Sequence, residues 1–299
     1  MRKPLIRTKY ELVYKSIDDA TLWLSAHGLN IDRTRIGEYK RVFKKFLDKY
    51  NSGNFTVEEQ KEFFSTYVNL VYETQELVYI SNGLSKLINS DLDERLKKFI
   101  KGPVINTAEN SDKSTNLGRN IAFELLIASK LSSSGFEIDL GTEADLSIIH
   151  NNIKIFIECK RPQYKHQINS NIKGAFRQLK KRYNEYDGQK NVLGLIALSV
   201  SKILNPDLDI LVSSNSFLMH SYIEKILDNF HNDHKKKYLN PGDQRTIGMI
   251  VYFSTPVSIE EEGIVAHSHL IDFTNCCDIH SKEIEIVREI AEIVDKGSS

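Results

Sequence analysis

Two apolar segments joined by Asn151 and Asn152 constrain the fold of this chain more than any other feature. Residues 144–160 read ADLSIIHNNIKIFIECK. Paired asparagines between two such segments favour the tight turn of a β-hairpin, so we predict antiparallel strands over 144–150 and 153–160. Residues at equal distances from a two-residue turn face each other across the hairpin. Asp145 is therefore expected nearly opposite Glu158.

The second strand of this hairpin carries Glu158 and Lys160, two positions apart. Side chains alternate along a strand, so both lie on one face. For an isolated Glu-x-Lys the simplest interpretation is an ion pair on that face. Asp145 makes this simple interpretation less favoured. Residues that face each other across a hairpin have Cβ atoms about 4.5–5.5 Å apart, so Asp145 would lie close to Glu158. Two carboxylates at that separation repel unless a cation or a proton lies between them.

A hard divalent cation such as Mg²⁺ is bound by one or two carboxylates together with water and phosphate oxygens. Lys160 could then hold or help to deprotonate an attacking water and stabilise negative charge on a phosphate. Glu124 interrupts the apolar run IAFELLIASKL and could reach such a metal from a preceding helix. The alternatives are an exposed helix position for Glu124 and a cap at a turn or strand start for Asp145.

A basic segment follows the strand. Residues 154–190 contain ten Lys and Arg against three Asp and Glu, although the whole chain has 40 of each class. Such a segment is commonly a solvated helix face. Beside catalytic carboxylates it would instead be a phosphate-binding surface. The expected nucleic-acid contacts are Arg161, Lys165, Lys173, Arg177, Lys180, Lys181 and Arg182.

The remaining sequence predicts an α/β fold with a mixed sheet, preceded by helices. Apolar stripes indicate helices over 17–29, 35–50, 56–84 and 91–100, and their tyrosines and phenylalanines are expected in a core rather than in a base-stacking surface. After a turn-rich stretch the pattern is one helix, three strands, a helix over 169–186, a strand over 191–200, a helix over 214–229, two strands and a final helix. We therefore predict a helical domain over 1–101, a linker over 102–117 and an α/β domain over 118–299.

The composition and the lack of certain motifs argue against several classes of protein for this chain. The 299 residues contain no apolar run near the ~20 residues of a membrane span, and the basic N-terminus lacks the apolar core of a signal peptide. Three cysteines without zinc spacing favour a reducing compartment, so a cytoplasmic location is expected. No phosphate loop of the Walker type and no Gly-x-Ser-x-Gly elbow occurs.

Four histidines are further candidates for a metal site or a phosphate contact. His267 and His269 share a strand face, but no third metal ligand is evident, and solvent-facing histidines are the favoured interpretation. His231 and His234 accompany three lysines in a predicted loop over 231–246, expected to be a solvated surface or a secondary phosphate contact.

The helix acid, the Asp at a strand start, the Glu-x-Lys and the basic helix together resemble the PD-(D/E)xK nuclease superfamily, over roughly 118–198. The resemblance implies a restriction-endonuclease-like core, a mixed sheet flanked by helices. It also implies that Asp145, Glu158 and the carbonyl of Cys159 bind the metal, with Lys160 as the catalytic lysine and Glu124 as the helix acid. The implied cofactor is Mg²⁺, with Mn²⁺ as a substitute.

Two positions depart from the usual motifs. Gln178 corresponds to the helix glutamine of exonuclease-type members, with Tyr183 as its partner, but the Gln-x4-Tyr spacing is one residue longer than theirs. Ala144 stands where the motif's name has proline, which the superfamily tolerates.

The resemblance implies a nuclease that hydrolyses phosphodiester bonds, with DNA favoured, in restriction, repair or anti-phage defence. The helical domain would select substrate shape, dock a partner protein or form a homodimer. One alternative is a catalytically silent module that binds nucleic acid or protein. Another is an α/β interaction protein in which Glu158 and Lys160 simply pair.

Overall fold

The computed structural model describes residues 4–53, 56–104, 113–141, 144–186, 191–238, 244–261, 264–276 and 283–297. The chain forms two compact units. Unit 1 comprises Met1–Ala122, Asp207–His220 and Thr255–Ser268, and unit 2 comprises Phe123–Pro206, Ser221–Ser254 and His269–Ser299. Two later segments are thus grouped with the N-terminal helices. Much of the predicted linker, residues 105–112, lies outside the described residues.

Four helices open unit 1: α1 (Pro4–Ala26), α2 (Arg35–Ser52), α3 (Val57–Leu84) and α4 (Ser90–Phe99). The predicted start of α3 is confirmed, because Thr56 and Glu59 form a capping box in which each side chain accepts the other's backbone N–H at 3.2 Å. Helix α1 begins well before the predicted Ile17. Tyr10 stabilises these earlier turns of α1, because its ring packs on Phe46 of α2 and Tyr67 of α3.

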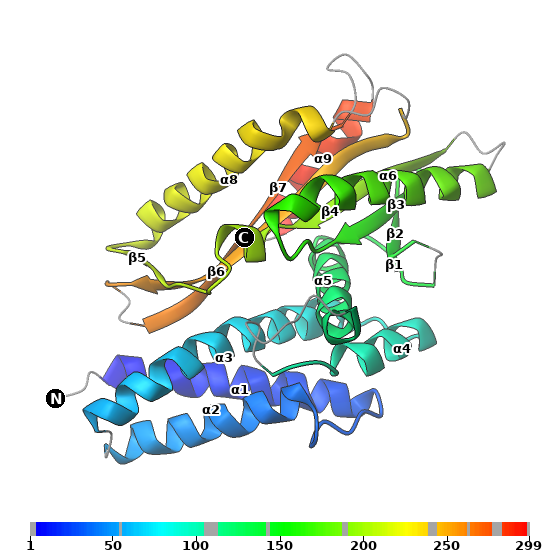
Figure 1. The fold of residues 1–299 in the computed structure, drawn as a ribbon. Helices are drawn as coiled ribbons and strands as arrows, with labels where there is room; N and C mark the ends of the chain where they lie inside the picture. The colour runs from blue at the N-terminus through cyan, green and yellow to red at the C-terminus, as the bar shows by residue number, and fades with distance from the viewer. Residues whose placement is uncertain are drawn as a thin grey trace. The chain divides into compact units, whose positions relative to one another are not determined.

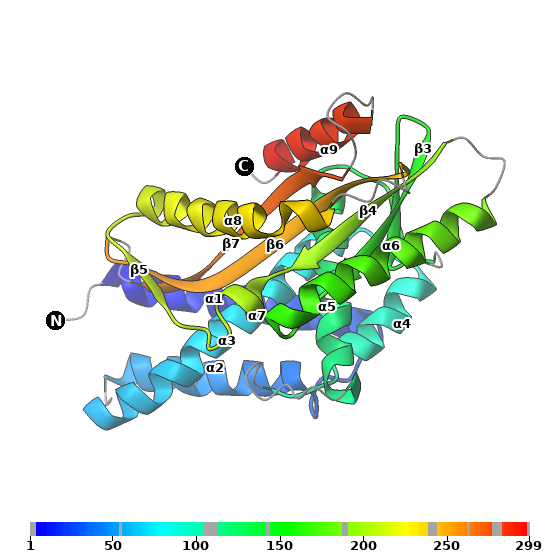
Figure 2. The same ribbon diagram turned by 45° about the horizontal axis from the view of Figure 1, so that its top comes forward.

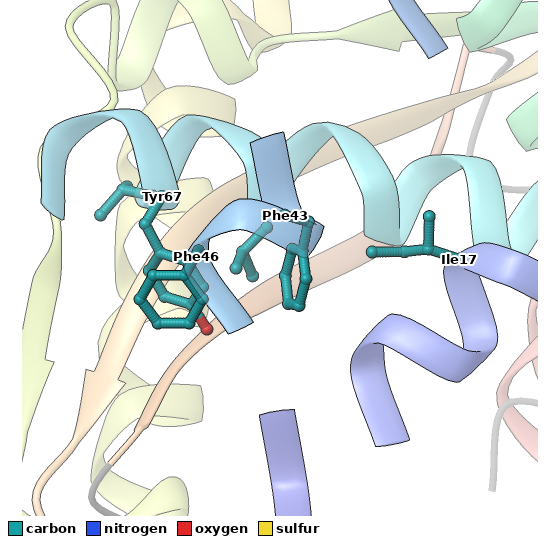
Figure 3. Packing of buried hydrophobic residues seen from close by; sticks show 6 residues of the cluster. Ile17, Phe43, Phe46 and Tyr67 are labelled. Atoms are coloured by element: carbon teal, nitrogen blue, oxygen red, sulfur yellow. The ribbon is translucent and has the colours of Figure 1, made fainter. Parts of the chain in front are cut away.

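The aromatic stripes of these helices form a core, as predicted. Ile17 of α1, Phe43 and Phe46 of α2 and Tyr67 of α3 are all buried in one cluster (Figure 3). Phe46 stacks on Tyr67 with ring centroids 4.5 Å apart. Burying a side chain of this size contributes about 1.5–3 kcal/mol. Because they are buried in this core, the rings are unavailable to stack on nucleic-acid bases.

A buried ionic network lies beside this core. Glu73 of α3 receives Arg35 of α2 on one carboxylate oxygen and Arg119 on the other. Arg35 also donates to the carbonyl of Phe99 at 2.9 Å, and Arg119 donates to the carbonyl of Pro103 at 3.1 Å. All three charged side chains are at most 4% exposed. The network thus joins α2 and α3 to the chain that follows α4.

The described strands form a mixed seven-stranded sheet in the order β1-β2-β3-β4-β6-β5, with β7 paired to β6 (Figure 1). Pairs β1–β2 and β2–β3 are antiparallel, whereas β3–β4, β4–β6 and β5–β6 are parallel. The mixed α/β class is therefore confirmed. The strands are β1 (Ile138–Asp139), β2 (Leu146–His150), β3 (Ile153–Lys160), β4 (Val192–Ser199), β5 (Leu211–Ser213), β6 (Thr246–Ile259) and β7 (Ile264–Asn275).

The β2–β3 hairpin has the predicted register. Leu146 pairs with Ile157, and His150 pairs with Ile153. Asn151 and Asn152 have φ of 49° and 61°, the left-handed conformation that a two-residue hairpin turn requires and that asparagine tolerates. Continuing the register by one residue places Asp145 opposite Glu158.

The other helices are α5 (Lys113–Ser133), α6 (Ile168–Glu185), α7 (Ser201–Leu204), α8 (Ser216–Tyr238) and α9 (Glu283–Gly297), with a 3₁₀ turn η2 (Lys165–Gln167) before α6. Helix α6 packs on β3 and β4. Figure 2 shows α6 and the C-terminal part of α8 on the same side of β4 and β6. None of the described helices has the length and apolar character needed to cross a membrane.

The predicted loop over 231–246 is wrong for its first half. Helix α8 continues through His231 and His234 to Tyr238. His234 and Tyr238 are buried, and the three lysines between them occupy the last turn, where cations interact favourably with the helix dipole. The short elements β5 and α7 were not predicted at all.

Candidate active site

The open end of the β2–β3 hairpin brings the predicted acids together. Asp145 directly precedes β2, and its Oδ2 accepts a hydrogen bond from the backbone N–H of Cys159 at 2.7 Å. This side-chain bond ties Asp145 to the end of β3, one residue beyond the last strand pair. Asp145 and Glu158 are consequently held side by side at the end of β3.

Lys160 lies between these carboxylates. Its Nζ donates to Glu158 Oε2 at 3.1 Å and lies 3.8 Å from Asp145 Oδ2. The Lys160 side chain is 16% exposed, that of Asp145 is 26% exposed and that of Glu158 only 1%. The cluster therefore has a solvent-accessible side, formed by Asp145 and Lys160, and a buried floor, formed by Glu158.

Arg182 of α6 completes the cluster from the facing helix. Its Nε is 3.9 Å from Glu158 Oε1, and another guanidinium nitrogen is 3.7 Å from Glu185. The sequence predicts Arg182 as a phosphate contact, but no pattern in it predicts the position of Arg182 beside Glu158. Gln178 lies one helical turn before Arg182 on the same side of α6, and it is exposed.

Burial is the largest influence on the pKa of Glu158. Its removal from water, followed by the neighbouring charge of Asp145, raises the pKa of Glu158 above the ordinary 4.5, although Lys160 and Arg182 act in the opposite direction. Among the described residues no group donates a hydrogen bond to Glu158 Oε1. The site thus contains a buried carboxylate whose negative charge is incompletely compensated, which a bound cation would correct.

We expect Glu158→Gln to be more stable than the wild type near pH 7 and to lose this advantage at about pH 4. The pKa of Glu158 is higher in the folded chain than in the unfolded one, so the free energy of unfolding of the wild type falls as the pH rises above 4.5. Each tenfold change in proton affinity is worth about 1.4 kcal/mol. Urea denaturation of both proteins across this range measures the difference.

Glu94→Gln is the matched control. Glu94 is an exposed acid that pairs with Lys97, and this pairing lowers the pKa of Glu94 below its ordinary value. It should show only a small effect, with the opposite dependence on pH. A Glu158→Gln variant that became less stable relative to the wild type as the pH rose would contradict the electrostatic account of the site.

Cys159 contributes its backbone rather than its thiol. Burial, then the charges of Asp145 and Glu124, raise the pKa of the thiol well above its ordinary value, so sulfur stays protonated and is a poor metal ligand. Because neighbouring side chains on a strand face opposite ways, Cys159 points to the face away from Glu158. Glu124, buried on α5, is close enough to affect that thiol.

The oxygen atoms of Asp145, Glu158 and Cys159 suit a hard cation. They are fewer than the resemblance implies, because Glu124 is not among them. Asp145 and Glu158 supply adjacent carboxylates, and the Cys159 carbonyl is the third oxygen implied by the resemblance. Within the described parts of the chain, no group of three or more His, Cys, Asp or Glu side chains is arranged to hold a metal. Glu124 therefore does not complete a three-side-chain group with the two acids. A cation with several water ligands, such as Mg²⁺, suits this arrangement.

The basic residues of α6 do not all lie on the side of the helix that carries Arg182. With 3.6 residues per turn, Lys173, Arg177 and Lys180 point roughly 140° away from the direction shared by Gln178 and Arg182. The first three are exposed. Of the other expected contacts, Lys165 is exposed in η2, Arg161 is half-buried after β3, and Lys181 is exposed and lies 3.8 Å from Glu185. Only part of the basic segment thus lies on the side of Glu158.

The histidines of β7 are not solvent-facing, which corrects that interpretation. The ring of His267 packs edge-on against Tyr72. His269 Nε2 lies 2.6 Å from Lys130 Nζ. Burial lowers the pKa of His269 to about 4 and that of Lys130 to about 8, so a neutral imidazole accepts a hydrogen bond from the lysine. On α8, His231 pairs with Asp272 at 2.7 Å.

Comparison of the chain with protein-family profiles, with curated proteins and with solved structures finds no match.

Proposed function

We propose that this chain is a Mg²⁺-dependent nuclease with a restriction-endonuclease-like core of the PD-(D/E)xK type, acting on DNA in preference to RNA. The observation that supports it most is the convergence of Asp145, Glu158 and Lys160 at one end of a hairpin whose register the sequence predicts. Glu158 is buried and Lys160 reaches solvent, which is the arrangement a site needs to hold a cation and face a phosphate.

Each residue has a distinct role in this proposal. Asp145, Glu158 and the carbonyl of Cys159 would hold Mg²⁺, which supplies Lewis acidity and a water nucleophile near neutral pH. Lys160 would donate a hydrogen bond to a non-bridging phosphate oxygen as negative charge develops there. Arg182 holds Glu158 in place and favours its ionised form. Glu124 would act at longer range, through water.

A catalytically silent nucleic-acid- or protein-binding module is the second candidate, and one observation favours it. Lys160 already bridges both carboxylates, so the three charges form a compact structural ion cluster without any metal. In that case Glu158 and Lys160 would serve only the stability of the hairpin end.

Thermal unfolding with Mg²⁺ separates these candidates. We expect saturating MgCl₂ to raise the Tm of the wild type and to leave that of Asp145→Asn unchanged, because the variant loses one of two anionic ligands. A ligand at a hundred times its Kd stabilises the folded state by about 2.7 kcal/mol. Equal shifts in the two proteins would show that Mg²⁺ binds elsewhere.

The function itself is tested by incubating the wild type with linear, supercoiled and single-stranded DNA and with RNA, each with Mg²⁺, Mn²⁺ or a chelator. Metal-dependent cleavage would support the nuclease and identify its substrate. Restriction, repair or anti-phage defence in the cytoplasm is the setting we propose for it, with the helical unit 1 available for a partner protein or a second copy of the chain.

A further inference from the structure

A strongly basic groove, apart from the carboxylate cluster, lies in unit 2 between α6 and the C-terminal end of α8. It encloses about 750 Å³ and is lined by Lys173, Arg177 and Lys180 from one helix and by Lys236 and Lys237 from the other. All five cations are exposed, and none of the described residues that line the groove is acidic. Like charges gathered in one concavity repel each other and concentrate anions, so this groove favours a polyanionic ligand.

The ordinary explanation for lysines near a helix end covers only part of this groove. Lys236 and Lys237 occupy the last turn of α8, where cations stabilise the helix dipole. Lys173, Arg177 and Lys180 lie inside α6, away from its C-terminal turn, and repeat at helical spacing along its side. The dipole therefore gives no reason for three cations of α6 to face two of α8.

The start of α6 adds donors to the same groove. Asn169 and Ser170 of the first turn line it. Helix α6 continues directly from η2, with the N–H of Ile168 donating to the carbonyl of Lys165, and the side chains of Ser170 and Asn171 donate to the carbonyl of Gln167. The exposed side-chain amide of Asn169 is therefore the donor that this turn offers to a phosphate oxygen.

The groove is separate from the carboxylate cluster. Its α6 residues point roughly 140° away from Gln178 and Arg182 around the helix axis. Lys173 and Lys180 are seven residues apart, about 10 Å along the helix axis, so this wall can contact more than one phosphate of a strand. The single aromatic ring in the lining, Phe176, is buried, which leaves no exposed ring in the described lining to stack on a base.

We propose that the α6–α8 groove binds the phosphodiester backbone of a nucleic-acid strand, without base specificity, at a site distinct from the Asp145–Glu158 cluster. This binding requires no metal and no cleavage. It holds whether or not the carboxylate cluster is catalytic, and in a nuclease it retains a strand that extends beyond the cut.

Fluorescence anisotropy with a labelled oligothymidylate, in EDTA, tests the proposal. We compare the wild type with Lys173→Gln/Lys236→Gln, which removes one cation from each wall. The matched control is Lys86→Gln/Lys97→Gln, which removes the same charge from exposed positions of unit 1. Thermal unfolding confirms that each variant is folded.

At about 0.1 M salt we expect the groove variant to bind roughly tenfold more weakly, and the slope of log K against log salt to fall by about 1.4, or 0.7 for each lost phosphate contact. The control should retain wild-type affinity and slope. Equal weakening of both variants would assign the effect to net charge, and unsaturable binding by the wild type would show that the groove holds no strand. Either result overturns the proposal.

Discussion

Lys160→Ala is expected to lower metal-dependent cleavage of DNA at least a hundredfold while leaving the protein folded. Removing one preorganised donor to a developing oxyanion commonly costs a factor of about 10²–10³ in kcat. Lys160 is the one cation that touches both Glu158 and Asp145 among the described ion pairs, and it is partly exposed toward solvent. Initial rates at saturating Mg²⁺, measured with the substrate that the wild type cuts best, give the ratio directly.

Lys154→Ala is the matched control for this measurement. Lys154 lies on the same strand and the same face as Lys160, but at the other end of β3, where it pairs with Asp139 at 3.4 Å and covers the ring of Phe156. Its removal tests the effect of deleting a lysine from this strand and should leave cleavage near the wild-type rate. A Lys160→Ala protein that cuts as fast as the wild type would place the reaction outside this cluster.

The hairpin could be predicted from sequence because local rules determine it. Asn151 and Asn152 fix the turn, the turn fixes the register, and the register places Asp145 opposite Glu158. The contact between Arg182 and Glu158 depends on how α6 packs on β3, and no pattern within α6 distinguishes Arg182 from its basic neighbours. Likewise, the lysines after His234 suggest a loop when taken alone. The buried Tyr238 beyond them keeps that segment helical.

The network around Glu73 illustrates the same limit in unit 1. Arg35, Glu73 and Arg119 are far apart in sequence, and each falls on a helix where a charged residue is expected at the surface. Their pairing follows from the packing of α2 and α3 against the chain after α4. Once buried, both arginines need an acceptor, because an unpaired charge in the interior is far more costly than an unpaired charge in water.

Glu73→Ala is therefore expected to lower the free energy of unfolding by about 3–5 kcal/mol, the range for removing one partner of a buried ion pair. Arg35 and Arg119 would retain bonds to the carbonyls of Phe99 and Pro103, but both would lose the carboxylate of Glu73. Urea denaturation monitored by circular dichroism measures the loss. Glu94→Ala provides the comparison, since it breaks an exposed pair with Lys97 and should change stability little.

Glu73→Gln separates the effect of charge from that of shape. The amide keeps one oxygen acceptor and nearly the same volume, yet it presents a donor to one of the two guanidinium groups and carries no negative charge. A loss of stability close to that of Glu73→Ala would show that the anion itself is required between Arg35 and Arg119. If both variants unfolded at the wild-type urea concentration, the Glu73 carboxylate would contribute nothing to stability, and the account of a required buried anion would be wrong.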